Sequence, residues 1–104
     1  MRYELHKGDI HVSETLEQAI AHKVTKVEER LKRYHPDAAD MEIRLAHQEK
    51  VNSFDCSIQL RAFRETLHCS KSAPELRVAV DKSFDALMKE LEHYRSRINK
   101  SLQS

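Results

Sequence analysis

Apolar residues recur at two different spacings along this chain, and each change of spacing marks the end of one secondary-structure element. Residues 2–6, 40–50, 53–63 and 65–70 alternate between apolar and polar side chains, as strands with one buried face do. Residues 14–33 and a segment of about 25 residues after Pro74 repeat apolar side chains every three or four positions, which is typical of amphipathic helices. The predicted order is therefore β-α-β-β-β-α.

Local signals mark where the two helices begin and end. Ser13 precedes the first helix and is a good N-cap, because its hydroxyl can accept a hydrogen bond from the free amides of the first turn. The His35-Pro36-Asp37 segment ends that helix, since the residue before a proline is displaced from helical geometry. Ser72-Ala73-Pro74-Glu75 has the form of a capping box with proline in the first turn, and it predicts the start of the second helix.

These elements predict an α+β fold made of one domain. A four-stranded sheet with both helices packed on one face would bury every apolar stripe in the sequence. A chain of 104 residues is the size of one domain, and it contains no linker, repeat or low-complexity segment. We assign residues 1–100 to the domain and expect residues 101–104 to form a frayed tail.

The composition restricts the cellular compartment in which we expect to find this protein. Charged residues make up 34% of the chain and hydrophobic residues 39%, which is a soluble, highly charged composition. No apolar run approaches the roughly 18–20 residues that span a bilayer, and residues 1–20 lack the features of a secretion signal. The two cysteines, Cys56 and Cys69, do not make a disulfide framework. We therefore expect a cytoplasmic protein with no membrane partner.

The sequence gives no pattern for catalysis, a metal or a cofactor. The histidines are scattered, with no pair at helical ligand spacing, and neither cysteine has a second cysteine at zinc spacing. Cys56 and Cys69 are in phase with the inward positions of their strands, where a thiol acts as a small hydrophobic group. One glycine in the whole chain rules out a glycine-rich phosphate loop. We expect no catalytic residues, no metal site, no cofactor and no small-molecule substrate.

Charge is sorted by position although the net charge is only +1. At 100° per residue, the basic residues of each predicted helix gather on one flank of its apolar stripe and the acidic residues gather on another. The basic flank of the first helix contains Lys23, Lys26, Arg30 and Arg33, and that of the second contains Lys82, Lys89, His93, Arg97 and Lys100. The acidic flanks contain Glu14, Glu17 and Glu28 in the first helix and Asp81, Asp85 and Glu92 in the second.

Two interpretations of this sorting remain open. Ridges of lysine and arginine can neutralise nucleic-acid phosphates and release counterions, which gives affinity without sequence preference. Alternatively, if the two helices run parallel, the basic flank of one can face the acidic flank of the other and form an ordinary salt-bridged seam.

Two stretches resemble a known family. One is Ile10-His11-Val12-Ser13-Glu14-Thr15-Leu16, which leads into the first helix. The other contains Ala79, Val80, Asp81, Asp85, Leu87 and Leu91 at the spacing of the signature A-I-D-x-x-x-D-K-L-x-x-Q-L. Taken with the element order, they make the chain similar to the ribosome hibernation-promoting factor and ribosome-associated inhibitor family, also called sigma-54 modulation proteins, over nearly its whole length.

The resemblance implies a double-stranded-RNA-binding-like fold and a translation silencer. Such a protein would occupy the mRNA and tRNA channel of the small ribosomal subunit, over ribosomal RNA, without any chemistry. By matching position, the family's RNA contacts fall on Lys23, Lys26, Lys89, Arg95 and Arg97. Together with the ridges, the candidate RNA-binding residues are Lys23, Lys26, Arg30, Arg33, Lys82, Lys89, Arg95, Arg97 and Lys100.

Apart from Val80 in place of isoleucine, the chain departs from the signature at two positions, and both departures lower the positive charge or add negative charge. Ala86 replaces its lysine and Glu90 replaces its glutamine. Two alternatives therefore stay open. One is a protein–protein module that uses the open sheet face, with Arg44, Gln59, Arg61 and the outward aromatic Phe63. The other is a generic binder of duplex RNA with no preference for the ribosome.

Overall fold

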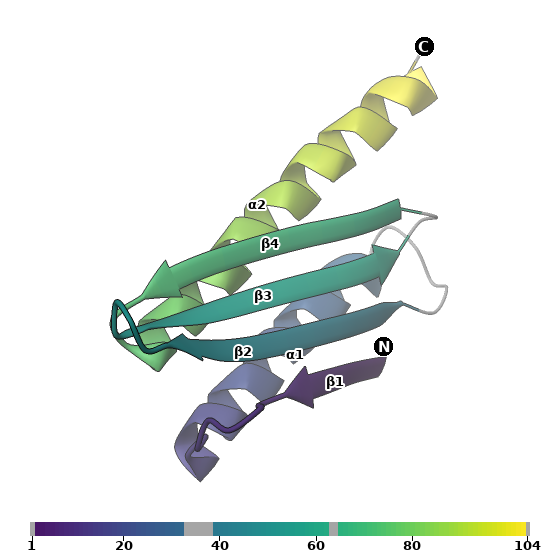
Figure 1. Ribbon diagram of the computed structural model, residues 1–104. Helices are drawn as coiled ribbons and strands as arrows, with labels where there is room; N and C mark the ends of the chain where they lie inside the picture. The colour runs from purple at the N-terminus through teal and green to yellow at the C-terminus, as the bar shows by residue number, and fades with distance from the viewer. Residues whose placement is uncertain (1, 33–38, 63–64, 104) are drawn as a thin grey trace.

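The computed structural model describes residues 2–32, 39–62 and 65–103, with side chains described as far as residue 94. Four strands and two helices follow the predicted order (Figure 1). Their bounds are β1 (Arg2–His6), α1 (Glu14–Lys32), β2 (Asp40–Gln48), β3 (Ser53–Ala62), β4 (Glu65–Ala73) and α2 (Leu76–Gln103).

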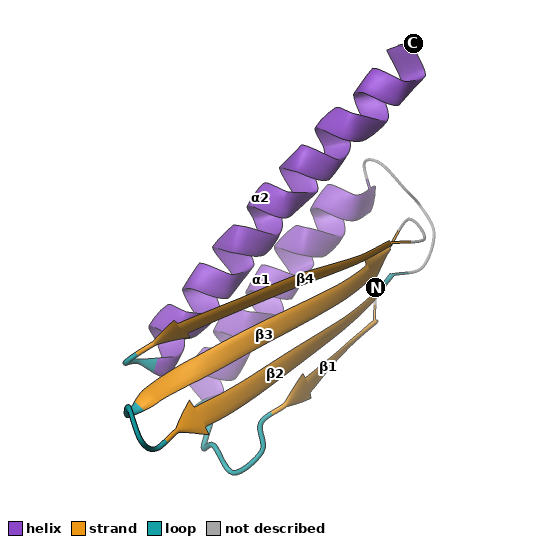
Figure 2. Ribbon diagram, turned by 45° about the horizontal axis from the view of Figure 1, so that its top comes forward, coloured by secondary structure: helices purple, strands orange, loops and turns teal. Residues whose placement is uncertain are grey.

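The strands form one mixed sheet in the order β1-β2-β3-β4. The edge strand β1 runs parallel to β2, with Glu4 opposite Glu42, while β2, β3 and β4 pair antiparallel through short connections. Both helices lie on the same face of this sheet and leave the other face open (Figure 2). The predicted α+β architecture, a four-stranded sheet with two helices on one face, is confirmed.

The core fills the layer between the sheet and the helices. Alternate residues of the three longer strands point into it, and one stripe of each helix covers them, as the two apolar periods predicted. Ile20, Ile43, Ile58 and Leu87 are completely buried at its centre. Cys56 and Cys69 also point inward, which confirms their predicted orientation.

The predicted start of α1 is confirmed in atomic detail. The Ser13 hydroxyl accepts a 3.1 Å hydrogen bond from the amide of Leu16, and the Ser13 carbonyl accepts a 2.9 Å bond from the amide of Glu17. Ser13 therefore satisfies a donor that would otherwise be free in the first turn.

The predicted capping box at the start of α2 is wrong. Ser72 and Ala73 belong to β4, where they pair with Asp55 and Phe54 of β3, and the Ser72 hydroxyl donates to the Asp55 carboxylate instead of capping a helix. The first helical hydrogen bond runs from the amide of Ala79 to the carbonyl of Glu75, at 3.1 Å. Sheet pairing thus extends β4 beyond the predicted residue 70.

The far end of α2 projects beyond the sheet (Figure 1). Among its described side chains, Leu91 is the last that is buried, whereas the helix continues to Gln103. The fraying of residues 101–104 stays a prediction, and the predicted helix stop at His35-Pro36-Asp37 lies outside the described residues. In the part of the chain that the structure describes, neither helix is long and apolar enough to cross a membrane.

Candidate nucleic-acid interface

The two helices lie side by side on the sheet and run in the same direction (Figure 1). This is the condition under which the basic flank of one helix faces the acidic flank of the other. Lys23 of α1 lies 3.0 Å from the Asp81 carboxylate of α2, and Arg30 of α1 pairs with Glu92 of α2. The interhelical seam is therefore salt-bridged at these two pairs.

The seam leaves Lys23 and Arg30 only partly available to an external anion. The Lys23 side chain is 26% exposed, and its ammonium also lies 6.0 Å from the centre of the Phe84 ring. Asp81 is shared with Arg77, whose guanidinium approaches to 3.9 Å. The structure thus assigns part of the predicted basic flank of α1 to holding the helices together.

Other predicted cations stay at the surface. Lys26 on α1 and Lys82 and Lys89 on α2 are all exposed. Lys82 and Lys89 line a hollow of about 440 Å³ between α2 and the sheet-edge strand β4, and Lys71 of β4 joins them there. We call this hollow the lysine groove; its lining residues are Lys71, Ser72, Lys82, Asp85, Ala86 and Lys89.

Sequence reasoning missed Lys71, because it followed the faces of the helices alone. Lys71 lies at the inward phase of β4, two residues from Cys69 and Ala73, which are both buried. It nevertheless remains exposed, because β4 is an edge strand whose outer side has no neighbouring strand. The available signal was the alternation of Cys69, Lys71 and Ala73, which continues past residue 70, where the strand was predicted to end.

The side chains of the other four predicted RNA-binding residues are not among those that the structure describes. Arg33 lies outside the described residues, and Arg95, Arg97 and Lys100 belong to the backbone of α2 beyond the last described side chain. All three belong to the last third of α2, which continues to Gln103.

The lysine groove has the chemistry of a phosphate site. Three lysines from two elements line one hollow, whereas the Ser72 hydroxyl at its edge is already bonded to the Asp55 carboxylate. Lysine binds phosphate as a compact point charge, so such a groove attracts a polyanionic backbone without reading its sequence. Asp85 adds one opposing charge, and Ala86 contributes none where the family signature has lysine.

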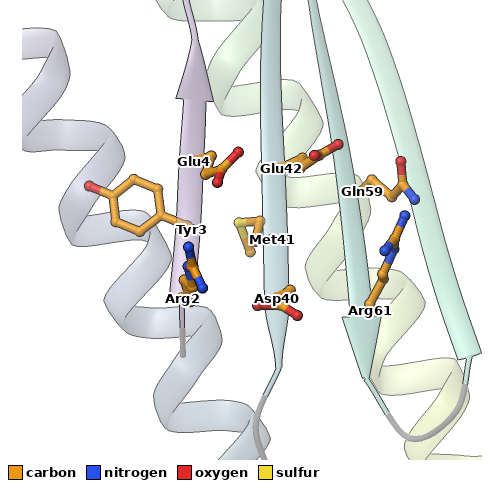
Figure 3. A pocket seen from close by; sticks show the side chains of 8 residues that line it. All are labelled: Arg2, Tyr3, Glu4, Asp40, Met41, Glu42, Gln59 and Arg61. Atoms are coloured by element: carbon orange, nitrogen blue, oxygen red, sulfur yellow. The ribbon is translucent and has the colours of Figure 1, made fainter.

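The open face of the sheet is different in character. Arg2, Asp40 and Arg61 lie in one row across β1, β2 and β3, with Glu4, Glu42 and Gln59 in the next (Figure 3). They surround a hollow of about 280 Å³. Charges of both signs alternate here, so this face does not form a continuous basic surface. Phe63, the aromatic residue expected on this face, lies outside the described residues.

The thiols are poor candidates for catalysis. Burial raises the pKa of Cys56 to about 11, against only a smaller lowering by the nearby Ser83 hydroxyl. Burial also raises the pKa of Cys69, and the Glu90 carboxylate adds to the effect. A nucleophilic cysteine needs a lowered pKa and access to substrate, and neither thiol has both.

Comparison with known proteins agrees with this fold. The family model described as sigma 54 modulation protein / S30EA ribosomal protein matches residues 3–99. The N-terminal domain of Thermus thermophilus Protein Y is 16% identical, with a TM-score of 0.70 over 86% of this chain and 93% of that chain. A ribosomal subunit interface protein from Coxiella burnetii is 13% identical, with a TM-score of 0.62 over 92% and 99%. No curated protein sequence matches the chain significantly.

Proposed function

The chain belongs to the sigma 54 modulation protein / S30EA ribosomal protein family, and we propose that it is a ribosome-binding silencer of translation. The family match over residues 3–99 is the observation that carries this proposal. The similar fold of a Coxiella burnetii protein described as a ribosomal subunit interface protein supports it. In this role the protein acts in the cytoplasm by occupying a site on the ribosome, and it catalyses no reaction.

The finer proposal is a site in the mRNA and tRNA channel of the small subunit, over ribosomal RNA. The lysine groove and the exposed Lys26 supply the positive charge that such a site requires. Each lysine that neutralises a phosphate releases condensed counterions, so the affinity depends steeply on salt. The projecting end of α2 would extend the contact through Arg95, Arg97 and Lys100.

The proposed RNA-binding residues are expected to contribute unequally to the affinity. Lys82 and Lys89 are the strongest candidates from the sequence, because both are exposed and share the lysine groove with Lys71. Lys23 and Arg30 contribute less, since their charges are already balanced by Asp81 and Glu92. Arg33 is proposed as a contact on the sequence pattern alone.

Co-sedimentation with separated ribosomal subunits tests the proposal. The wild-type protein is expected to pellet with the small subunit, and its binding is expected to fall steeply between about 50 and 200 mM salt. The Lys82→Glu, Lys89→Glu double variant removes two phosphate contacts. We expect it to bind less tightly and to lower the slope of log affinity against log salt by about 2.

The matched control is the Arg44→Glu, Arg61→Glu double variant. It makes the same change of charge on the open sheet face, where both arginines are exposed. It should bind the ribosome like wild type, with circular dichroism confirming that both variants fold. Loss of binding in the control alone would move the interface to the open face, as the protein–protein alternative requires. Absence of any binding at low salt would refute the ribosome proposal.

Competition separates the generic duplex-RNA alternative from a ribosome-specific one. An excess of duplex RNA of unrelated sequence should leave the ribosomal complex largely intact if the channel is the site. If the duplex displaces the protein at an equivalent phosphate concentration, the lysine groove binds RNA without regard to its source, and the channel proposal fails.

A further inference from the structure

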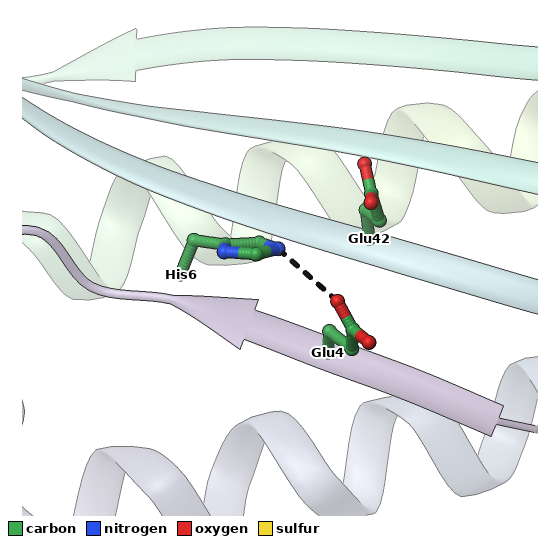
Figure 4. A group of neighbouring side chains, drawn as sticks. All are labelled: Glu4, His6 and Glu42. Carbon is green, nitrogen blue, oxygen red and sulfur yellow. Dashed lines mark ion pairs between the residues drawn. The ribbon is translucent and has the colours of Figure 1, made fainter.

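Three side chains with metal-ligating atoms meet on the open face of the sheet, away from the lysine groove (Figure 4). Glu4 and His6 are two residues apart on β1 and so point to the same side, and Glu42 lies opposite Glu4 on β2. One ligand atom from each of the three residues lies within 4.8 Å of the other two. Parallel pairing of β1 with β2 is what brings them together.

The imidazole of His6 has an unsatisfied nitrogen within this cluster. Its Nε2 is shielded from solvent and is the buried side-chain polar atom that lacks a hydrogen-bond partner among the described residues, although the side chain as a whole is 41% exposed. The nearest Glu4 oxygen is 3.5 Å away, and the contact does not have the geometry of a hydrogen bond. A shielded nitrogen without a partner is unfavourable, and a metal ion that accepts its lone pair would remove the cost.

The two carboxylate side chains keep the cluster open to solvent, since Glu4 is 55% exposed and Glu42 is 38% exposed. Arg44 lies 3.6 Å from the Glu42 carboxylate, and it is the positive group that competes for this ligand. Its side chain is 64% exposed, so it can turn into solvent without breaking any buried contact. Glu4 and Glu42 also line the adjoining hollow of the open face (Figure 3), which provides a route from solvent.

From this geometry we propose that Glu4, His6 and Glu42 bind a divalent transition metal, with Zn²⁺ as the expected ion. One imidazole nitrogen and two carboxylate oxygens form a ligand set that suits Zn²⁺, whereas Mg²⁺ and Ca²⁺ prefer oxygen alone. Zinc holds such ligands at about 2.0–2.2 Å. Small rotations of the two glutamate side chains would close the cluster to that size. Three protein ligands leave a fourth position for water or for a donor from a partner.

The bound metal would link the edge strand β1 to β2, because it would take ligands from both strands. Sequence spacing could not reveal it, because Glu42 is 36 positions from His6 and joins it only through the sheet. This site does not depend on the proposed ribosomal function: it lies on the opposite side of the sheet from both helices.

Calorimetric titration of the metal-free 104-residue chain with ZnCl₂ tests the proposal. Wild type is expected to bind one Zn²⁺ with saturation, and the His6→Ala and Glu42→Gln variants are expected to bind at least about tenfold more weakly. The matched control is His68→Ala, because His68 is an exposed histidine on the same sheet face in β4. It should bind Zn²⁺ like wild type.

A Co²⁺ titration followed by visible absorption gives a second readout. Wild type and His68→Ala should develop the same d–d bands, and His6→Ala should lose them. Melting curves recorded in chelator establish that every variant folds without metal. The proposal is overturned if wild type shows no saturable binding, or if His6→Ala and His68→Ala weaken binding equally, as scattered surface histidines would.

Discussion

Ser83 is a polar residue placed in the centre of an otherwise apolar interface. It is fully buried on α2, and its hydroxyl donates a 2.6 Å hydrogen bond to the Cys56 carbonyl of β3. The bond ties a helix to a central strand at a point where water cannot replace it. A buried donor is tolerated only when it has such a partner.

The Ser83→Ala variant is expected to lower the free energy of unfolding by about 1 kcal/mol, the usual net value of one buried hydrogen bond. Urea denaturation measures the change. Ser70→Ala is the control, because the Ser70 hydroxyl bonds Ser57 at 3.0 Å on the exposed face. It should shift stability by less than about 0.5 kcal/mol. An equal loss in both variants would mean that burial of the Ser83 bond does not matter.

The Cys56 thiol makes stability depend on alkaline pH. Its pKa is about 11 in the native protein because of burial, against 9.0 for an ordinary thiol. The native state therefore holds this proton more tightly than the unfolded state does. The contribution is fully present below pH 9 and is lost as the pH rises from 9 towards 11, at about 1.4 kcal/mol per pH unit.

The measurement is the free energy of unfolding between pH 8 and 10.5 in wild type and in Cys56→Ala. Wild type should lose stability more steeply above pH 9, since the variant lacks the titrating thiol while its other groups are unchanged. Parallel curves for the two proteins would show that Cys56 ionises equally easily in both states.

The two helices join each other through charge as well as through the core. Two ion pairs follow one another along the parallel helices: Lys23 with Asp81, and Arg30 with Glu92. Partly exposed ion pairs contribute little stability each, but they fix which flank of one helix faces the other. Their geometry leaves Lys82 and Lys89 turned towards the lysine groove.

A double-mutant cycle with Lys23→Ala and Asp81→Ala measures the coupling free energy of one of these ion pairs. The expected coupling is about 0.5 kcal/mol at low ionic strength, and it should shrink in 1 M salt, where the screening length is about 3 Å. Lys32 pairs with Glu28 on its own helix, so a cycle of Lys32→Ala with Asp81→Ala should give almost no coupling. A coupling free energy that does not change with salt would contradict an ionic interaction between Lys23 and Asp81.

All six elements share a single core. Buried residues of α1, β2, β3, β4 and α2 belong to one cluster, and Leu5 of β1 packs against it. Removing any one element would expose the apolar face of its neighbours. A shared core of this kind favours cooperative unfolding without intermediates.

We therefore expect one unfolding transition for the whole molecule. Circular dichroism of the helices and chemical labelling of the buried Cys56 in a Cys69→Ala background should give the same midpoint in urea. Cys56 labelling that precedes the loss of helix would show that the sheet opens separately, and it would contradict a single cooperative unit.

Periodicity carried most of the prediction of the fold. The alternation in β2 and β3 and the stripe in α1 located their buried residues correctly, because burial on one face leaves a repeat that can be read without coordinates. The capping box at Ser72 failed for the opposite reason. A local motif there competed with pairing to β3, and the hydrogen bonds of the sheet extended the strand.

The sequence predicted only part of the candidate site. Helical phase identified Lys82 and Lys89 as neighbours, because residues seven apart on a helix share a face. It could not decide whether Lys23 was free or paired with Asp81, since that depends on how two distant helices are placed. The meeting of Lys71 with Lys82 and Lys89, and that of Glu4 and His6 with Glu42, brings together residues of different elements, so no spacing along the chain showed that they lie close together.

The amino-acid sequence alone is sufficient to predict the order of the elements, the face that each one buries and the sorting of charge around each helix. These properties follow from local geometry, in which a residue's direction depends on its position within one helix or strand. The tertiary structure alone decided which charges neutralise one another and which remain at the surface. An ion pair forms only when the two charged groups approach to about 4 Å, so pairing between elements is settled only when packing of the shared core fixes how the helices and strands lie together.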